Sequence, residues 1–227
     1  MATTLRDVEI RSALRTKLQH IHADEPDTAI IEELSLCQGN ARVDIAVVNG
    51  LISGYEIKSD RDKLVRLPHQ LSVYQRCLDA MTVVAGRRHI AACYETLPPC
   101  WGIWEASSTP DGVSIQSRRE PMPNGGVEPQ DVVQLLWRGE AYEALQERGI
   151  SPPRRGARRD LWAALLSGVP SRELLEIVRD RIRARGDWRS GPTPFRGGGL
   201  SRCVAGSQRS QMNRQWLLSR RSRCRPH

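Results

Sequence analysis

One lysine is unusual in a chain that otherwise uses arginine for positive charge. Only 3 of the 34 basic residues are lysines, and one of them, Lys58, follows Glu56 by two positions in an apolar run. Lysine is a compact point charge that can approach a water or a phosphate end-on, whereas arginine is a planar fork. The run is typical of a strand, in which residues two apart project from one face. We therefore expect Glu56 and Lys58 to act together.

A second acidic residue lies in the preceding apolar run. Asp44 is separated from Glu56 by a strong turn signal, Asn49-Gly50. A carboxylate in a buried strand needs a metal or a partner to offset its desolvation. Two carboxylates and a lysine on neighbouring strands would suit Mg²⁺ or Mn²⁺, which prefer oxygen donors, beside a positioned water. The alternative is a salt bridge from Asp44 to a nearby basic residue, either Arg42 or Lys58.

The length of that turn decides whether the two carboxylates can share a face. A two-residue turn would place Asp44 and Glu56 on opposite faces of the sheet, because side chains alternate along a strand. We therefore predict an odd-membered loop with Gly50 at positive φ, or a compensating bulge near Gly54. The carboxylates should lie about 3–5 Å apart. The pairs expected for a loop ending in Gly50 are Val47 with Leu51 and Asp44 with Gly54.

The apolar periodicity predicts an α/β protein with the order helix, three-stranded antiparallel meander, helix, strand, followed by a C-terminal helical extension. The expected helices are residues 5–20, 62–80, 130–148 and 160–185. The expected strands are residues 29–37, the two runs around Asn49-Gly50, residues 81–85 and 90–94, and two edge strands near 101–104 and 113–115. We place the main domain in residues 1–127, the extension in 128–187 and a tail in 188–227.

The positive charge is confined to the tail. The 227-residue chain has a net charge of +8, and residues 186–227 contain nine Arg and one acidic residue, which accounts for all of it. The Gly-, Ser- and Arg-rich tail is therefore expected to be disordered and to attract phosphates in a salt-dependent way. The chain has no signal-peptide pattern and no apolar run of ~20 residues, so we expect a cytoplasmic protein. Its six cysteines show no metal spacing and should be reduced, mostly buried thiols.

These residues resemble the PD-(D/E)XK nuclease superfamily. Asp44 corresponds to its metal-binding aspartate, and Glu56 and Lys58 correspond to its E-x-K pair. Gln70 and Tyr74, which are four apart and share a helical face, resemble the Q-x-x-x-Y element of RecB-like and Cas4-like members. Residues 5–189 are also similar to a family of small bacterial proteins assigned to this superfamily. The segments that carry this similarity are Gly-Tyr-Glu-Ile-Lys-Ser-Asp at 54–60, Arg-Leu-Pro-His-Gln at 66–70 and Leu-Leu-Trp-Arg at 135–138.

The resemblance implies a restriction-endonuclease-like core and metal-dependent hydrolysis of phosphodiester bonds, with DNA as partner in repair, recombination or defence. Asp44, Glu56 and the Ile57 carbonyl would hold Mg²⁺ or Mn²⁺, and Lys58 would orient the attacking water. Glu9 is the further acid that several members place on the first helix, although a solvated surface role is an equal alternative. Val43 stands where the motif name has proline, which is a common variation.

Other residues have a functional and a structural interpretation. Either Glu32 or Glu33 must face inward beside the Asp44 strand, as a second acidic candidate. The tryptophans could stack on bases, but Trp101, Trp104 and Trp137 are better interpreted as core aromatics. The two histidines near the motif, His69 and His89, are interpreted as structural. The candidate phosphate-binding residues are Arg42, Arg66, Arg154 and Arg155.

Two other functions fit the same sequence. The first is a catalytically silent module that binds nucleic acid or protein on the same fold, but such a module is expected to have lost one of Asp44, Glu56 and Lys58. The second is a toxin or mobile-element accessory whose partner masks the site. A homodimer is compatible with each function.

Overall fold

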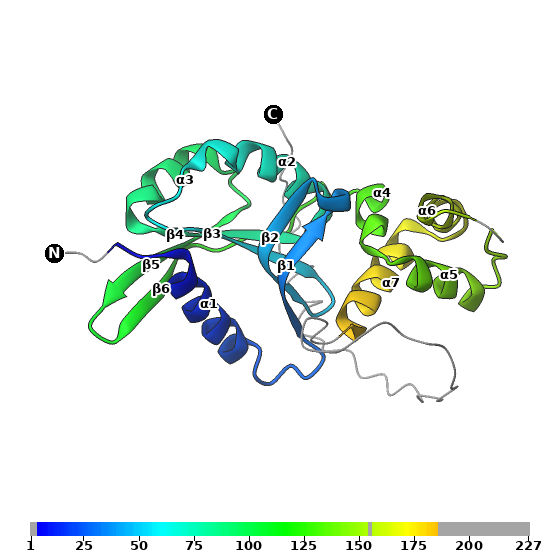
Figure 1. The fold of residues 1–227 in the computed structure, drawn as a ribbon, viewed down its shortest axis with the longest axis horizontal. Helices are drawn as coiled ribbons and strands as arrows, with labels where there is room; N and C mark the ends of the chain where they lie inside the picture. Colours follow the sequence, from blue (N-terminus) through cyan, green and yellow to red (C-terminus); the bar gives the residue numbers. More distant parts are fainter. Residues whose placement is uncertain (1–3, 154–155, 186–227) are drawn as a thin grey trace.

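A six-stranded mixed sheet forms the centre of the protein (Figure 1). The computed structural model describes residues 4–153 and 156–185. The strands lie in the order β1-β2-β3-β4-β5-β6. Their bounds are β1 Ala29–Leu36, β2 Ala41–Val48, β3 Ile52–Lys58, β4 Ala80–Gly86, β5 Gly102–Thr109 and β6 Gly112–Arg119. The first three strands pair antiparallel, β3-β4 and β4-β5 pair parallel, and β5-β6 is an antiparallel hairpin.

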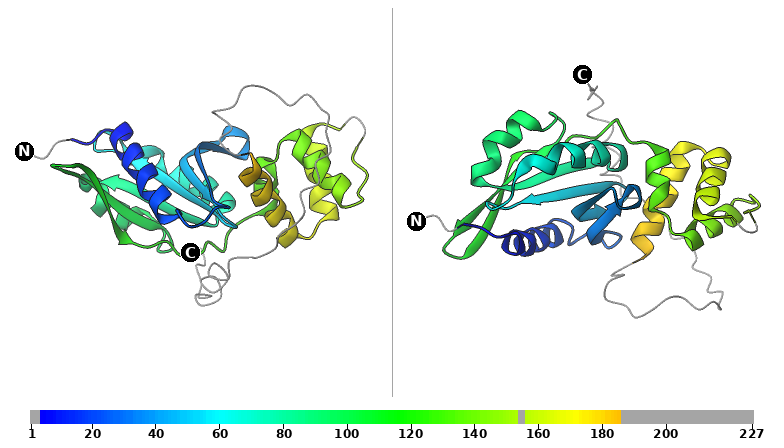
Figure 2. Two further views of the ribbon diagram at one scale, coloured as in Figure 1. Left: turned by 90° about the horizontal axis from the view of Figure 1, so that it is seen from below. Right: turned by 45° about the horizontal axis from the view of Figure 1, so that its top comes forward.

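Helices cover both faces of this sheet (Figure 2). Helix α1 lies on one face, and α2 and α3 lie on the other. Four further helices pack beside the β1-β2 end of the sheet (Figure 1). Their bounds are α1 Asp7–Ile21, α2 Leu67–Cys77, α3 Ile90–Thr96, α4 Pro129–Val132, α5 Arg138–Glu147, α6 Arg158–Gly168 and α7 Ser171–Ala184. The predicted order of helix, three antiparallel strands, helix and strand is therefore present in a mixed α/β protein.

The sequence of helix α1 explains why this segment is helical and which of its faces is buried. Its buried residues Ile10, Leu14 and Leu18 recur at helical spacing and pack on β2, β3 and β5. Glu9 caps the start of the helix: its carboxylate accepts hydrogen bonds from the Arg6 amide at 2.8 Å and from the Arg6 guanidinium at 3.2 Å. The first turn is thus closed by a side chain that satisfies an otherwise unused backbone donor.

Helix α2 is shorter than the predicted segment 62–80. Its first turn contains Pro68, which has no N–H to donate and is favoured at a helix start. A short 3-10 turn, Leu64–Arg66, precedes it. Before that, the Asp62 carboxylate accepts the Ser59 amide at 2.7 Å and the Ser59 hydroxyl at 2.6 Å, which closes a separate turn.

Several other predictions of elements were wrong. Residues 90–94 form α3 rather than a strand, and β5 is an interior strand, so only β6 of that pair is at an edge. The predicted helix 130–148 is broken after the 3-10 turn Val133–Leu135, and 160–185 is broken at Pro170, which precedes α7. Trp101 and Trp104 are buried as expected. Trp137 is 47% exposed, with the Arg185 guanidinium 4.1 Å from its ring centre.

The helical extension shares its core with the sheet. One continuous apolar cluster joins the α2 face of the sheet to α4–α7, and Arg179 of α7 forms an ion pair with Asp79 at 2.6 Å. Strands end at Arg119 and helices resume at Pro129, close to the expected boundary at 127. The predicted tail, 188–227, lies outside the described residues. Within the described residues, no helix is long and apolar enough to cross a bilayer.

The four described cysteines have the burial that was expected for most of the thiols. Cys37, Cys77, Cys93 and Cys100 are all buried. The sulfur atoms of Cys37 and Cys77 are 3.4 Å apart without a covalent bond between them. Burial raises the pKa of the Cys93 thiol to about 11, so this thiol is protonated at neutral pH and packs as an apolar group.

We expect Gly54→Ala to destabilise the protein. A Cβ atom at Gly54 would lie 2.5 Å from Leu78 and 2.7 Å from Met81, so the α2 face of β3 would be overpacked, at a cost of about 1–3 kcal/mol. Gly139→Ala is the control, because no atom lies within 4 Å of a Cβ at that helical position; it should be neutral or stabilising by up to ~1 kcal/mol. Urea denaturation of both variants measures the difference. Equal midpoints would contradict the close packing at Gly54.

Candidate active site

The β2-β3 hairpin has the odd-membered loop that the shared site requires. Val48 pairs with Ile52, which leaves a three-residue loop, and its middle residue Gly50 has φ +98°. The predicted parity and the predicted conformation of Gly50 are thus confirmed. The predicted pairs were wrong, because Gly50 does not end the loop but lies at its centre. Gly54 pairs with Ala46 and not with Asp44, and the ladder ends at the pair Ile45–Tyr55, just before Asp44 and Glu56.

The β1-β2 ladder is interrupted at the level of Asp44. The pairs run from Ala29 to Glu32 and resume at Leu34, so Glu33 and the opposing Asp44 do not pair. Glu33 has φ +57°, a left-handed conformation that costs on the order of 1–3 kcal/mol for such a residue. Ile31 and Leu34 consequently both face the α2 side of the sheet. At this break, regular strand pairing with β1 does not constrain Asp44.

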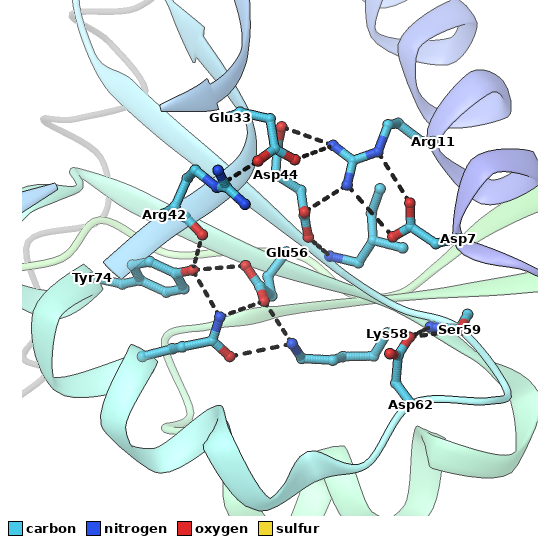
Figure 3. A network of polar contacts seen from close by, with 12 residues as sticks. Asp7, Arg11, Glu33, Arg42, Asp44, Glu56, Lys58, Ser59, Asp62 and Tyr74 are labelled. Atoms are coloured by element: carbon cyan, nitrogen blue, oxygen red, sulfur yellow. Dashed lines mark hydrogen bonds and ion pairs between the residues drawn. The ribbon is translucent and has the colours of Figure 1, made fainter. Parts of the chain in front are cut away.

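Arg11 of α1 holds Asp44 from one side of the sheet (Figure 3). Its guanidinium donates to Asp44 Oδ1 at 2.6 Å and to the Asp44 carbonyl at 3.2 Å. The same group lies 3.1 Å from carboxylate oxygens of Asp7 and of Glu33. The other Asp44 oxygen, Oδ2, accepts the Ile57 amide at 2.7 Å. The Arg11 guanidinium therefore contacts three carboxylates. The central one, Asp44, is also held by the backbone of β3.

Glu56 is the centre of a second network on the α2 side of the sheet (Figure 3). It is 3% exposed. Its Oε1 accepts the Lys58 ammonium at 2.6 Å and the Gln70 amide at 2.8 Å, and its Oε2 lies 2.7 Å from the Tyr74 hydroxyl. That hydroxyl is also 2.8 Å from the Arg42 carbonyl. Sequence positions separated by up to 18 residues thus converge on one carboxylate.

Helix α2 presents Gln70 and Tyr74 to Glu56 because they are one turn apart on the buried side of the helix. The Gln70 amide is shared: its nitrogen donates to Glu56, and its oxygen accepts Lys58 at 3.2 Å. The Lys58 side chain is 12% exposed, so its position is set by these two acceptors. The ring of Tyr74 stacks on Trp101, with centres 6.3 Å apart.

Burial, together with repulsion by a neighbouring carboxylate, disfavours negative charge on both central carboxyl groups. Desolvation raises the pKa of Asp44, although the Ile57 amide and Arg11 oppose this effect. Desolvation also raises the pKa of Glu56, and the charge of Asp44 raises it further, while Lys58 opposes the rise. Desolvation followed by the charge of Glu56 raises the pKa of Tyr74, which stays a neutral phenol. The two strands thus bring together carboxyl groups that would gain from a nearby cation.

The donor chemistry fits a divalent ion, but the carboxylates are already bonded within the protein. Asp44 and Glu56 supply hard oxygen atoms from adjacent strands, as Mg²⁺ and Mn²⁺ prefer. In residues 4–153 and 156–185, no group of three or more His, Cys, Asp or Glu residues is arranged to hold a metal. An ion would therefore need Arg11 or Lys58 to give up a contact. The predicted carboxylate spacing of about 3–5 Å stays a prediction.

Some predicted site residues lie elsewhere. Glu9 closes the start of α1 and its charge is satisfied by Arg6, so the structure does not bring it to Asp44. Of the two neighbouring acids, Glu33 is the one that joins the Arg11 network, whereas Glu32 pairs with Arg15 at 2.8 Å. His69 lies in the first turn of α2 and is exposed. His89 is buried and donates from Nε2 to the Ser59 carbonyl at 3.1 Å, a structural role.

The four arginines predicted to bind phosphate differ in where they lie. Arg42 forms an ion pair with Glu33 through Nε, and its side chain is largely exposed beside the site. Arg66 is exposed on the segment that leads into α2. Arg154 and Arg155 lie outside the described residues. Of these four candidates, only Arg42 therefore touches the Asp44 network directly in the part of the chain that the structure describes.

Two participants were missed by the sequence analysis. Arg11 and Asp7 are four apart and form an ion pair at 3.1 Å on α1, a spacing that signals a helical pair. That signal was present in the sequence, but it indicates only a surface pair. Nothing in the local sequence of α1 shows that its Arg11 would reach β2.

Comparisons with known proteins show that the chain is similar to a phage protein. The family described as Bacteriophage P4 protein cII matches residues 1–190 of the chain. Protein cII of Enterobacteria phage P4 is 26% identical to this chain over 223 residues, which are 98% of the chain and 81% of that protein. No solved structure matches the chain. The matched residues include both networks around Asp44 and Glu56.

Proposed function

Because the chain belongs to the Bacteriophage P4 protein cII family, whose name states no activity, we propose a function from its own site: a metal-dependent nuclease of the PD-(D/E)XK type, with DNA as the favoured substrate. The restriction-endonuclease-like interpretation of the core is part of the same proposal. It is supported by the order of elements from α1 to β4 and by the position of the motif residues on β2, β3 and α2.

One observation carries the proposal. Lys58, Glu56 and Gln70 form a closed set of contacts at 2.6–3.2 Å on adjoining elements, next to Asp44 on the facing strand. A lysine and a glutamate this buried are costly to keep unless they are paired, and hydrophobic residues of similar volume would often be at least as stable. A polar cluster on a sheet face therefore indicates chemistry more than stability.

Each residue of the site has its own role in the proposed hydrolysis of a phosphodiester bond. Asp44, Glu56 and the Ile57 carbonyl would hold Mg²⁺ or Mn²⁺, which supplies charge neutralisation at the phosphate and lowers the pKa of a bound water. Lys58 places a positive charge where the attacking water and the scissile phosphate meet, and so stabilises charge that develops in the transition state. Gln70 and Tyr74 fix the orientations of Lys58 and Glu56.

A second candidate function is favoured by one observation. Both oxygens of Asp44 and both oxygens of Glu56 already have a partner within the protein. A catalytically silent module that binds nucleic acid or protein would keep these contacts for stability alone. The two functions differ in whether a divalent ion enters the site and whether a phosphodiester bond is broken.

Incubation with labelled DNA tests the choice. We expect the purified full chain to cut single-stranded, nicked or branched DNA in Mg²⁺ or Mn²⁺ and to be inactive in excess EDTA. Glu56→Gln keeps a group of the same shape but removes the charge, so it should fold and fail to cut. Parallel reactions with RNA determine the substrate class. Cleavage that persists in EDTA, or an active Glu56→Gln protein, would exclude the metal-nuclease function.

A further inference from the structure

Two loops at one end of the sheet carry exposed positive charges next to Lys58. β3 and β4 are parallel, with Lys58 beside Ala85, so the segments that follow them leave the sheet at the same end. Residues 59–66 follow β3 and residues 87–89 follow β4. We call these two segments the loop pair. Its exposed cations are Arg61, Lys63, Arg66, Arg87 and Arg88.

The acidic residues of the loop pair do not neutralise these cations. Asp62 accepts the amide and hydroxyl of Ser59, and Asp60 accepts the Leu5 amide at 3.2 Å. Both carboxylates are therefore bonded to groups other than the basic side chains. Among the described residues, none of the five cations forms an ion pair within 4 Å.

The loop pair is held as one surface. The buried ring of His89 donates to the Ser59 carbonyl at 3.1 Å and joins the two loops. Gly86 packs closely on Asp60, because a Cβ atom at Gly86 would lie 2.9 Å from the Asp60 carboxyl carbon. Between the cations Lys63 and Arg66, the apolar side chain of Val65 is 82% exposed. This surface combines fixed positive charge with an apolar contact point.

Most other basic residues of the described chain are already paired. Arginines of α1, β2 and α7, and Arg148 directly after α5, form ion pairs, and Lys17, Arg119 and Arg158 lie over aromatic rings. The first 185 residues also have no net charge. Unpaired cations on the loop pair are thus a local excess and not a consequence of a basic chain. Local excess positive charge is what a phosphate backbone recognises.

We propose that the loop pair binds the phosphodiester backbone of a nucleic acid strand and directs it toward Lys58. This inference rests on the proposed nuclease function for its orientation, but the binding itself does not require cleavage. Exposed side chains of Arg and Lys contact successive phosphates, and Val65 contacts the sugar face between them. The surface recognises charge and backbone, so it is indifferent to base sequence.

Binding measured in EDTA tests the loop pair without chemistry. The full-length protein is titrated against a fluorescent DNA strand at several salt concentrations, and anisotropy gives the affinity. Two variants each remove the cations of one loop: R61Q/K63Q/R66Q and R87Q/R88Q. Each should bind at least about 10-fold more weakly, and the slope of log K against log salt should fall by ~0.7–0.9 for each phosphate that the variant no longer neutralises. The control is R138Q/R159Q, which removes exposed arginines of α5 and α6 that likewise lack ion pairs among the described residues.

The outcomes are distinguishable from those of the cleavage test. A protein that never cuts but shows the reduced slope in both variants retains the binding surface and excludes the nuclease function. A cutting protein whose variants bind like the control variant excludes the binding surface and retains the nuclease function. Unlabelled RNA and polyglutamate of equal charge serve as competitors. If polyglutamate competes as well as DNA, the surface binds acidic polypeptides and the nucleic-acid assignment is overturned.

Discussion

Lys58→Ala should reduce the rate of phosphodiester cleavage by about 10²–10³-fold, the reduction found when one transition-state donor is removed from an active site. The ammonium of Lys58 lies 2.6 Å from Glu56 and 3.2 Å from Gln70, and no other described cation contacts this pair of acceptors. Lys58→Arg should fail almost as badly. The larger planar fork cannot occupy the same position without displacing Gln70 or Glu56. Single-turnover cleavage in Mn²⁺ measures both variants.

Lys17→Ala is the matched control, because Lys17 lies over the Trp104 ring on the other face of the sheet. It should cut at the wild-type rate. DNA affinity in EDTA should change little in Lys58→Ala, since the side chain is only 12% exposed and acts on the reacting phosphate. If Lys58→Arg cuts like the wild type, a diffuse positive charge is enough, and the special role of lysine is wrong.

Much of the site could be predicted because the signals were local. The parity of the β2-β3 loop follows from side-chain alternation, and Asn49-Gly50 identifies where φ must be positive. Gln70 and Tyr74 were predicted from the resemblance to the Q-x-x-x-Y element, their spacing of four places them on one helical face, and both contact Glu56. The inference on the loop needs only the order of residues along two strands, whereas the inference on Gln70 and Tyr74 also needs the resemblance.

The remaining features depend on distant contacts that no local pattern encodes. Glu33 adopts a left-handed conformation inside β1, although glutamate is not a residue that favours it. Its ion pairs with Arg11 and Arg42 accompany that conformation. Residues 90–94 have a short apolar pattern that fits a strand or a helix equally well. Glu9 was placed in the site by resemblance. A resemblance identifies a sequence position on a helix but does not show where the side chain at that position points.

Arg11→Met should destabilise the metal-free protein and make it more responsive to divalent ions. The substitution keeps an apolar stem but leaves Asp44, Glu33 and Asp7 without their shared cation. Removing one partner of a fully buried pair costs ~3–5 kcal/mol. The Arg11 and Asp44 side chains are 20% and 18% exposed, so water screens part of this effect and we expect a cost of about 2–3 kcal/mol. Thermal unfolding in EDTA measures the change.

Mn²⁺ should then stabilise Arg11→Met more than the wild type, because an ion that binds only the folded state shifts the equilibrium in proportion to its affinity. In the wild type, the ion must compete with the guanidinium for Asp44 Oδ1. Arg15→Met is the control: Arg15 pairs with Glu32 at the surface, so its removal should cost at most ~1 kcal/mol and leave the Mn²⁺ response unchanged. Equal Mn²⁺ stabilisation of Arg11→Met and the wild type would show that the ion does not bind at Asp44. The raised pKa values of Asp44 and Glu56 would then reflect two buried carboxyl groups that are stabilised only by contacts within the protein, Arg11 and Lys58 among them, as the catalytically silent module requires.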